Sequence, residues 1–368
     1  MSFKRLFQRA LAAAPERLHF AAHSHHLWPD ASYVGQLAAW DDAARLADRK
    51  WERVMGQIWP AGQHHVATEL RLPDPNTIVF APNTHDLLLR IVSALPQHPL
   101  RILTSDGEFH SFRRQAERWE EAGAASVERV PLTGIVKRAQ SGEHDLIFVS
   151  HVQFNTGHVF ENLAPLAQLS RPEGPWVVID GYHGFMAMET DLSGVADRLF
   201  YLAGGYKYAM AGEGCAFLHA PPGYGPRPEI TGWYAEFDDL AAAPGRIGYA
   251  PDARRYLGST FDPSGIYRFV AVRDMLDDEG LTTATITAHV DALRARLLAD
   301  LPLGAGLLNP GSPARFVALR SPQAQRWQAE LEAQDIITDV RGDVLRIGFG
   351  LHQDARDVGR LVEALKRL

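Results

Sequence analysis

A single lysine lies in the apolar, glycine-rich stretch LAGGYKYAMAGEGCAF, residues 202–217. The flanking residues predict that Lys207, between Tyr206 and Tyr208, is buried. Burial of an unpaired ammonium is unfavourable, so such a lysine usually loses its proton or has a partner. A neutral buried amine is a nucleophile and can also carry a proton, which makes Lys207 a candidate catalytic residue.

Other chemically useful side chains follow the ends of predicted strands. The segment WVVID ends at Asp180, and His183 lies in the turn that follows. Asn83 and Thr84 stand where a predicted strand gives way to a helix, and first-turn amides and a hydroxyl there can hold an anion. Phe109 follows a third strand. Ligands of open α/β sheets bind beyond the carboxyl ends of the strands, so we expect these residues to share one site.

The combination of groups predicts a cofactor. Pyridoxal 5'-phosphate (PLP) requires a lysine for an imine, an acid for its pyridine nitrogen and fixed donors for its phosphate. Taken singly, each residue has an ordinary structural interpretation, such as a helix cap, a core aromatic ring or a lysine that reaches solvent. Their coincidence at neighbouring strand ends is what favours a PLP site.

The elements that must position these residues are visible as apolar runs. Runs rich in Val, Ile, Leu and Phe without polar alternation predict buried strands at 76–80, 101–105, 145–150, 176–180, 199–203 and 215–219. Amphipathic patterns between them predict helices at 84–95 and 111–123. This alternation predicts an α/β fold with a mostly parallel sheet and helices on both faces.

The pattern changes near residue 265 and predicts a smaller α+β domain. Helices are expected at 267–279, 282–301, 322–334 and 353–368, and strands at 315–319, 336–340 and 343–349. An amphipathic helix is expected at the N-terminus, with Phe3, Leu6, Phe7 and Leu11 on one face. We therefore predict an N-terminal segment (1–50) that packs with the small domain or a partner subunit, a large PLP-binding domain (51–264) and a small C-terminal domain (265–368).

Composition narrows the class of protein. The 368 residues are 46% hydrophobic and 22% charged, an ordinary soluble globular composition. A net charge of −7 without a basic tract gives no reason to expect nucleic acid or an anionic membrane surface. One cysteine, Cys215, excludes an internal disulfide and fits a reducing compartment, so we expect a cytoplasmic protein. The basic start of the chain leaves a transit peptide as an alternative.

The stretch 177–223 resembles the cofactor-binding region of kynureninases, which are fold-type I PLP enzymes of the class V aminotransferase superfamily. The shared pattern is an Asp, a His three residues later, and a Tyr-Lys pair before a glycine-rich turn. Here Asp180 and Lys207 are 207 − 180 = 27 positions apart. Further similar segments are LHFAAHSHHLWP (18–29), HVQFNTGHVF (151–160), GWY (232–234) and VLRIGFGLHQ (344–353). The resemblance thus spans nearly the whole chain.

The resemblance implies a role for each matching residue. Lys207 would carry the cofactor covalently, Asp180 would pair with the pyridine nitrogen, and Phe109 would stack on the ring. The other implied cofactor contacts are Asn83, Thr84, His183 and Tyr206 from the same subunit, and Trp233 and Thr260 from its neighbour. The resemblance therefore implies a homodimer with composite sites. Arg346 would hold the substrate carboxylate as a planar, bidentate fork.

The implied reaction is hydrolysis of the Cβ–Cγ bond of kynurenine or a related γ-carbonyl L-amino acid, which gives L-alanine and a carboxylic acid. The chain departs from the family pattern near the substrate. His23, Ser24, His25 and His26 stand where kynureninases usually have Asn-Ser-Leu-Gly, and TFDPSGIYRF (260–269) stands at the Asn-Pro-Pro turn. We therefore expect His23, Ser24 and His26 to shape the substrate pocket.

Several alternatives remain open from the sequence. A class V aminotransferase acting on a small or aromatic amino acid would start with the same α-proton removal by Lys207. A cysteine desulfurase is disfavoured because Cys215 lies only eight residues after Lys207, in a predicted strand. A non-enzymatic PLP-binding protein is a further alternative. The clustered histidines, including His64 and His65, lack acidic or cysteine ligands in an ordered spacing, so no metal site is expected.

Overall fold

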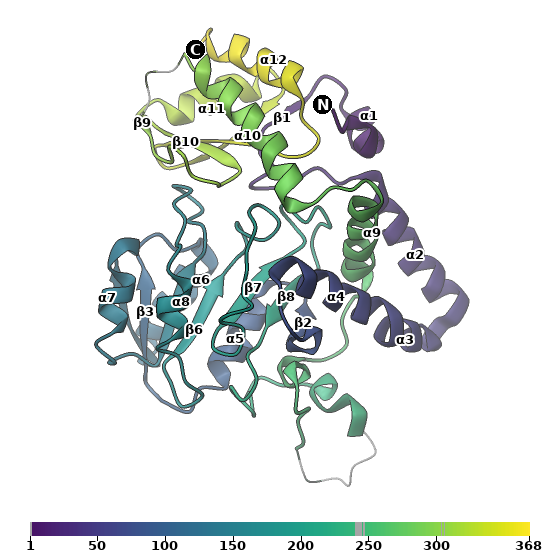
Figure 1. Ribbon diagram of the computed structural model, residues 1–368, viewed down its shortest axis with the longest axis vertical. Coiled ribbons are helices and arrows are strands. Elements are labelled where there is room, and N and C mark those ends of the chain that lie inside the picture. Colours follow the sequence, from purple (N-terminus) through teal and green to yellow (C-terminus); the bar gives the residue numbers. More distant parts are fainter. Residues whose placement is uncertain (1, 240–244, 246, 303, 305) are drawn as a thin grey trace.

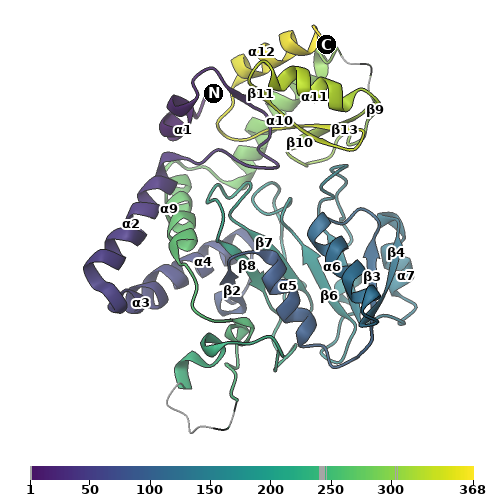
Figure 2. The ribbon, with the colours of Figure 1, turned by 180° about the vertical axis from the view of Figure 1, so that it is seen from behind.

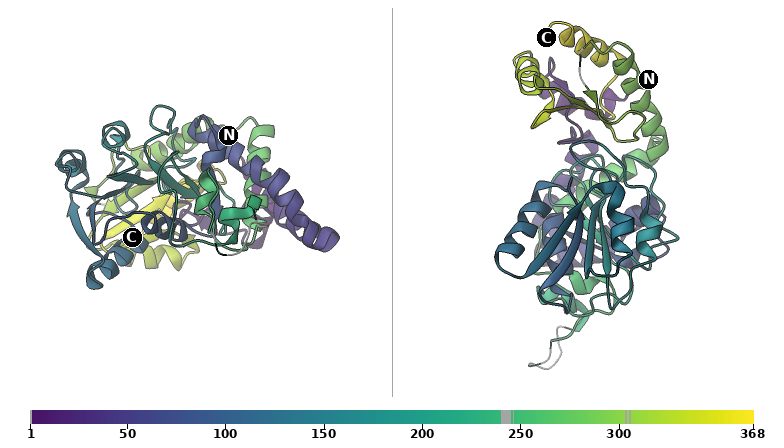
Figure 3. Two further views of the ribbon diagram at one scale, coloured as in Figure 1. Left: turned by 90° about the horizontal axis from the view of Figure 1, so that it is seen from below. Right: turned by 90° about the vertical axis from the view of Figure 1, so that its left-hand side faces the viewer.

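The computed structural model describes residues 2–239, 245, 247–302, 304 and 306–368. The described chain forms two lobes, a larger one around a central sheet and a smaller one that contains the C-terminus (Figure 1). The side view in Figure 3 shows the smaller lobe stacked beyond one end of the central sheet.

The central sheet comprises seven strands in the described part of the chain, in the order β2-β8-β7-β6-β5-β3-β4. The strands are β2 (Ile78–Ala81), β3 (Leu100–Ser105), β4 (Ala125–Val130), β5 (Leu146–Ser150), β6 (Trp176–Asp180), β7 (Phe200–Gly204) and β8 (Ala216–His219). β8 is antiparallel to both its neighbours, and the other pairings are parallel. The predicted α/β fold with a mostly parallel sheet is therefore confirmed.

The inner strands carry the apolar runs that predicted them, and every residue of β5 and β7 is buried. β4 was not predicted, because its exposed edge position alternates polar residues such as Ser126 and Glu128 with half-buried apolar ones. An edge strand has one solvated side and lacks the continuous apolar run of a strand covered on both faces.

Helices of the larger lobe pack on the sheet and position its loops. They are α4 (Trp59–Leu70), α5 (Thr84–Ser93), α6 (His110–Glu121), α7 (Ile135–Ala139) and α8 (Leu163–Ala167). α5 packs against β7 and β8, α6 against β4, and α7 against β3, as the reverse view in Figure 2 shows. Short 3-10 segments cover Ala47–Arg49, Pro75–Thr77, Leu132–Gly134, Trp233–Asp239 and Ala253–Tyr256.

A helical arm extends away from the central sheet (Figures 1 and 3). It consists of α2 (Asp30–Leu46) and α3 (Lys50–Arg53), and a π-helical turn (Val54–Ile58) joins α3 to α4. α2 packs along α9 (Ser264–Asp278), where Tyr267 donates a hydrogen bond from its hydroxyl to Asp42 Oδ2 at 2.9 Å. Gly35 permits this approach, because a Cβ there would lie 2.6 Å from the carbonyl oxygen of Tyr267.

The smaller lobe contains an antiparallel sheet in the order β12-β13-β10-β9. Its strands are β9 (Gly306–Leu307), β10 (Phe316–Arg320), β12 (Asp339–Arg341) and β13 (Val344–Gly348), and its helices are α10 (Thr283–Ala299), α11 (Ala324–Glu332) and α12 (Ala355–Leu365). The chain begins with a 3-10 turn (Lys4–Phe7) and α1 (Gln8–Ala13), and the turn buries Leu6 and Phe7 as the amphipathic pattern predicts. β1 (Leu18–His19) then pairs in parallel with β11 (Ile336–Ile337).

The predicted strand at 336–340 is wrong as a single element. Residues 336–337 pair with β1, whereas Asp339–Arg341 pair with β13 in another sheet. Sequence periodicity does not show a change of pairing partner, and β1 lies more than 300 positions away along the chain. The division into segments 1–50, 51–264 and 265–368 stays a prediction.

Candidate active site

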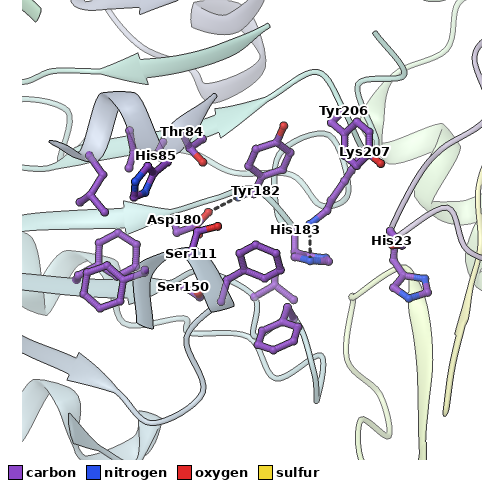
Figure 4. A pocket seen from close by; sticks show the side chains of 18 of the residues that line it. His23, Thr84, His85, Ser111, Ser150, Asp180, Tyr182, His183, Tyr206 and Lys207 are labelled. Atoms are coloured by element: carbon purple, nitrogen blue, oxygen red, sulfur yellow. Dashed lines mark hydrogen bonds between the residues drawn. The ribbon is translucent and has the colours of Figure 1, made fainter. Parts of the chain in front are cut away.

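A pocket of about 300 Å³ opens between the carboxyl ends of the central strands and the smaller lobe (Figure 4). The strand register explains why polar residues meet here, since Ser150 at the end of β5 lies beside Asp180 at the end of β6. The polar and charged side chains that line the pocket are His23, Ser24, Thr84, His85, Ser111, Ser150, Asp180, Tyr182, His183, Tyr206, Lys207, Arg341 and Arg346.

Lys207 follows β7 and is buried, with 9% of the residue exposed. Its Nζ lies 2.7 Å from Nε2 of His183, a contact drawn in Figure 4. Burial lowers the pKa of Lys207 to about 7, although the nearby Asp180 carboxylate acts in the opposite direction. The rings of Tyr182 and Phe109 lie 4.9 and 5.5 Å from the same Nζ. The amine is therefore held in a fixed, aromatic-lined position.

Asp180 is the last residue of β6, is half-buried and lines the pocket. Its Oδ1 accepts a hydrogen bond from the backbone N–H of Tyr182 at 3.0 Å. Burial raises the pKa of Asp180, while this hydrogen bond and the charge of Lys207 favour the ionised form. A cationic group bound next to Asp180 would further favour the ionised carboxylate.

His183 is buried and contacts the lysine amine. Burial, and then the charges of Lys207 and Arg346, hold the pKa of His183 well below its ordinary value, so the ring is neutral. Among the described residues, no partner reaches the Nδ1 of His183. The resemblance to kynureninases assigns His183 to holding the cofactor, and the structure places it directly on Lys207.

The start of α5 presents the predicted anion site. Asn83 caps the helix by accepting the backbone N–H of Asp86 on its side-chain oxygen at 2.9 Å. Thr84 and His85 line the main pocket and also an adjoining open cleft, to which Asn83 contributes. The first-turn amides of α5 and the Thr84 hydroxyl therefore belong to a region that a ligand in the pocket can reach.

Two aromatic residues of the predicted cofactor set also line the pocket. Phe109 lines the pocket, remains 37% exposed and contacts Phe154 edge-on at a ring-centroid distance of 5.3 Å. Tyr206 also lines the pocket and packs edge-on against His25 at 5.2 Å. Both rings present apolar surface to the space in front of Lys207.

Arg346 reaches the pocket from β13 of the smaller lobe and is buried. Its Nε donates to Asp339 Oδ1 at 2.7 Å, its Nη2 donates to the same oxygen, and its Nη1 donates to the carbonyl of Phe154. The guanidinium expected to hold a substrate carboxylate is therefore already paired with a carboxylate of the protein.

Four predicted site residues do not line the pocket, namely Asn83, which lines only the adjoining cleft, and His26, Trp233 and Thr260. His26 is buried elsewhere, with its Nδ1 on the carbonyl of Leu27 at 2.7 Å and its ring 5.1 Å from that of His352. Trp233 and Thr260 bond to each other, Nε1 to Oγ1 at 3.2 Å, and Trp233 is 42% exposed. By contrast, His23 and Ser24 do line the pocket.

The sequence reasoning missed several residues of the site. Asp339 and Arg341 alternate along β12, and an Asp-x-Arg pattern ahead of Arg346 is the signal that could have indicated them. Glu108 is buried behind the pocket, where the backbone N–H of Ser150 donates to its two carboxylate oxygens at 3.1 and 3.0 Å. Burial raises the pKa of Glu108 to about 7. Glu108 is a glutamate next to an aromatic residue in a loop, and its sequence context gives no comparable indication that it belongs to the site.

Two other features of the described residues concern metals and membranes. No three His, Cys, Asp or Glu side chains among them gather in an arrangement that could hold a metal ion. No helix in the described part of the chain is long and apolar enough to cross a membrane.

Comparison with known proteins gives the fold. No protein-family model and no curated protein sequence matches this chain. The cystine C–S lyase C-DES, solved with its product cysteine persulfide, matches with a TM-score of 0.82 and 18% identity over 97% of this chain and 99% of that one. The Escherichia coli cysteine desulfurase CsdA matches with a TM-score of 0.81 and 17% identity over 99% and 97% of the two chains.

Another C-DES structure, with a TM-score of 0.82 and 18% identity over 100% of this chain and 99% of that one, contains glycine covalently linked to its PLP cofactor. At such identities the likeness establishes the architecture. The chain therefore shares the α/β fold of these C–S lyase and cysteine desulfurase structures.

Proposed function

We propose that the protein is a PLP-dependent enzyme that acts on an L-amino acid, with Lys207 as the residue that carries the cofactor. The observation that carries this proposal is a buried lysine amine, 2.7 Å from His183, in the same pocket as Asp180. A pKa of about 7 leaves a large fraction of the amine neutral at physiological pH, as a nucleophile towards an aldehyde must be.

The residues of the pocket fit PLP. Asp180 would hold a proton on the pyridine nitrogen, Phe109 offers a ring face, and the Thr84 hydroxyl with the first-turn amides of α5 would receive the phosphate. The Nδ1 of His183, to which no described residue hydrogen bonds, also fits a polar ligand in this space. Bound there, PLP would supply an electron sink for negative charge at the α-carbon of the substrate.

The chain's own residues would divide the remaining work. Lys207 is the base that takes the α-proton, and its contact with His183 fixes the position of Nζ. Arg346 would orient the substrate through its carboxylate, with the guanidinium held between Asp339 and the carbonyl of Phe154. Residues from both lobes line the pocket, which limits the access of water.

Within this class, we propose hydrolysis of the Cβ–Cγ bond of kynurenine or a related γ-carbonyl L-amino acid to L-alanine and a carboxylic acid. The resemblance in sequence supports this reaction, and so does His23. Its ring is fully buried, lines the pocket and has no hydrogen-bond partner on either nitrogen among the described residues. Burial lowers the pKa of His23 to about 3, so a neutral imidazole is available to the γ-carbonyl or to a water molecule.

A desulfurase that stores sulfur on its own cysteine is a poorer fit, although the structural neighbours include cysteine desulfurases. Cys215 is 2% exposed, and burial raises its pKa to about 12. A buried, protonated thiol cannot act as a sulfur acceptor. A class V aminotransferase remains the second candidate, because α-proton removal by Lys207 serves both reactions.

Two measurements test the proposal. Borohydride reduction of PLP-treated protein, followed by peptide mapping, should place the pyridoxyl group on Lys207, and a protein that takes up no PLP would refute the cofactor assignment. Incubation with kynurenine, 3-hydroxykynurenine and a panel of amino acids should release alanine with an anthranilate. A keto acid, with pyridoxamine phosphate left on the protein, would instead identify an aminotransferase.

A further inference from the structure

On the side of the pocket formed by the smaller lobe, two arginines share one aspartate as their ion-pair partner. Arg346 Nε donates to Asp339 Oδ1 at 2.7 Å, and Arg341 Nη2 lies 3.0 Å from Asp339 Oδ2. Each arginine thus contacts a different oxygen of the same carboxylate. Both arginines line the pocket.

The β12–β13 hairpin explains this arrangement. Asp339 lies opposite Arg346 in the antiparallel register, and Arg341 lies two residues further along β12. Residues two apart on a strand, and residues directly opposite on the neighbouring strand, share one face of a sheet. The hairpin therefore presents all three charged side chains on the face that meets the pocket.

The net charge of this cluster matters because its surroundings are apolar. The side chains of Arg346 and Asp339 are 3% and 10% exposed, and the rings of Phe154 and Phe316 each lie 5.8 Å from the guanidinium of Arg346. Charges interact more strongly in such an apolar setting than in water. Arg341 is 40% exposed and stands nearer to solvent.

The neighbouring titratable groups do not change this count. Burial lowers the pKa of His23, 3.9 Å from Asp339, to about 3, and holds the pKa of His183 well below its ordinary value. Burial also lowers the pKa of His110, whose ring lies 5.1 Å from that of Phe154, so these rings are neutral near pH 7. Lys207 is committed to the cofactor under the proposed function. Two arginines and one aspartate therefore leave one net positive charge.

We propose that Asp339 is a specificity-determining residue. Its carboxylate reduces the combined charge of Arg341 and Arg346 to that of one cation, so that the pocket selects substrates with a single carboxylate over amino acids with a second acidic group. The inference rests on the proposed function only in that the substrate carboxylate meets Arg346. One carboxylate neutralises the cluster, whereas a second would be desolvated without a counter-charge.

The test is calorimetric binding of propionate and glutarate to the PLP-loaded protein and to the apoprotein, at low and high salt. Asp339→Asn should raise the ratio of glutarate affinity to propionate affinity about tenfold at low salt, and added salt should diminish the effect. The matched control is Asp343→Asn, which removes an exposed carboxylate 3.5 Å from Arg320 in the same lobe and should leave the ratio unchanged.

A second variant keeps the inference testable if Asp339→Asn does not fold. Arg341→Gln changes a half-exposed side chain and should lower the same ratio severalfold, and the double variant Asp339→Asn/Arg341→Gln should return it towards the wild-type value. An unchanged ratio in Arg341→Gln, or in a folded Asp339→Asn, overturns the inference, as does wild-type protein that binds neither acid. If the protein took up no PLP but the apoprotein gave the expected affinity ratios, only the proposed function would be overturned.

Discussion

At the scale of single residues, the buried lysine determines a measurable pH dependence. The pKa of Lys207 is lowered to about 7, chiefly by burial, whereas in the unfolded chain it returns to its ordinary value of 10.5. Between these values the unfolded state binds one more proton than the folded state, so the stability of the fold rises with pH across this window. Below pH 7 the folded protein carries the full cost of a buried ammonium.

We therefore expect Lys207→Met to flatten this part of the pH profile of the apoprotein. Wild-type protein should gain about 4 kcal/mol of unfolding free energy between pH 7 and pH 10.5 that the variant does not gain. The measurement is denaturant unfolding at several pH values. The control, Lys137→Met at an exposed lysine, should retain the wild-type slope. Parallel profiles for wild type and Lys207→Met would show that the lysine is not held in its neutral form.

At the scale of elements, the cap of α5 links local helix stability to the anion site. Asn83→Ala removes the side-chain oxygen that accepts the N–H of Asp86 and should cost about 1 kcal/mol of unfolding free energy. Because Thr84 and the first-turn amides would receive the phosphate, PLP affinity, measured by absorbance titration, should fall severalfold.

A second cap provides the matched control for this prediction. Thr282 caps α10 in the smaller lobe, where its hydroxyl accepts the backbone N–H of Thr285 at 3.2 Å. Thr282→Ala should cost a similar free energy and leave PLP affinity unchanged. Equal PLP affinities in the two variants would show that the start of α5 does not belong to the cofactor site.

At the scale of the whole molecule, the projecting arm presents several exposed apolar side chains. Val34 and Trp40 on α2 are 62% and 68% exposed, and Tyr33 and Leu37 beside them are each 43% exposed. Exposed apolar patches of this kind mark protein interfaces. Trp233, whose role in the resemblance is to reach the neighbouring subunit, is also exposed and does not line the pocket of its own chain. We therefore propose the homodimer that the resemblance to kynureninases implies.

The double variant Val34→Lys/Trp40→Lys should convert this dimer to a monomer, because two buried charges at a symmetric interface would be left without partners. Light scattering coupled to size-exclusion chromatography measures the mass. PLP retention should fall in the same variant if Trp233 and Thr260 contribute across the interface. Gln140→Lys, an exposed position outside the arm, should change neither property. A wild-type protein that is monomeric at all concentrations would refute the dimer.

The sequence by itself determined the features that depend on local composition. Continuous apolar runs predicted the inner strands, and an apolar, glycine-rich setting predicted the burial of Lys207. The position of Asp180 at the end of a buried strand followed from the same run, because parallel strands bring their carboxyl ends to one edge. These inferences needed only neighbouring residues and the geometry of a sheet.

The tertiary structure alone decided which distant groups meet. His23 and His26 are three residues apart in one loop, yet His23 lines the pocket beside Phe316, whereas His26 packs against His352. Likewise, the Asp-x-Arg pattern of β12 does not by itself show that Asp339 pairs with the guanidinium of Arg346. Side-chain partners depend on strand register and on contacts between segments far apart in the chain, and neither is encoded in the local pattern of residue types.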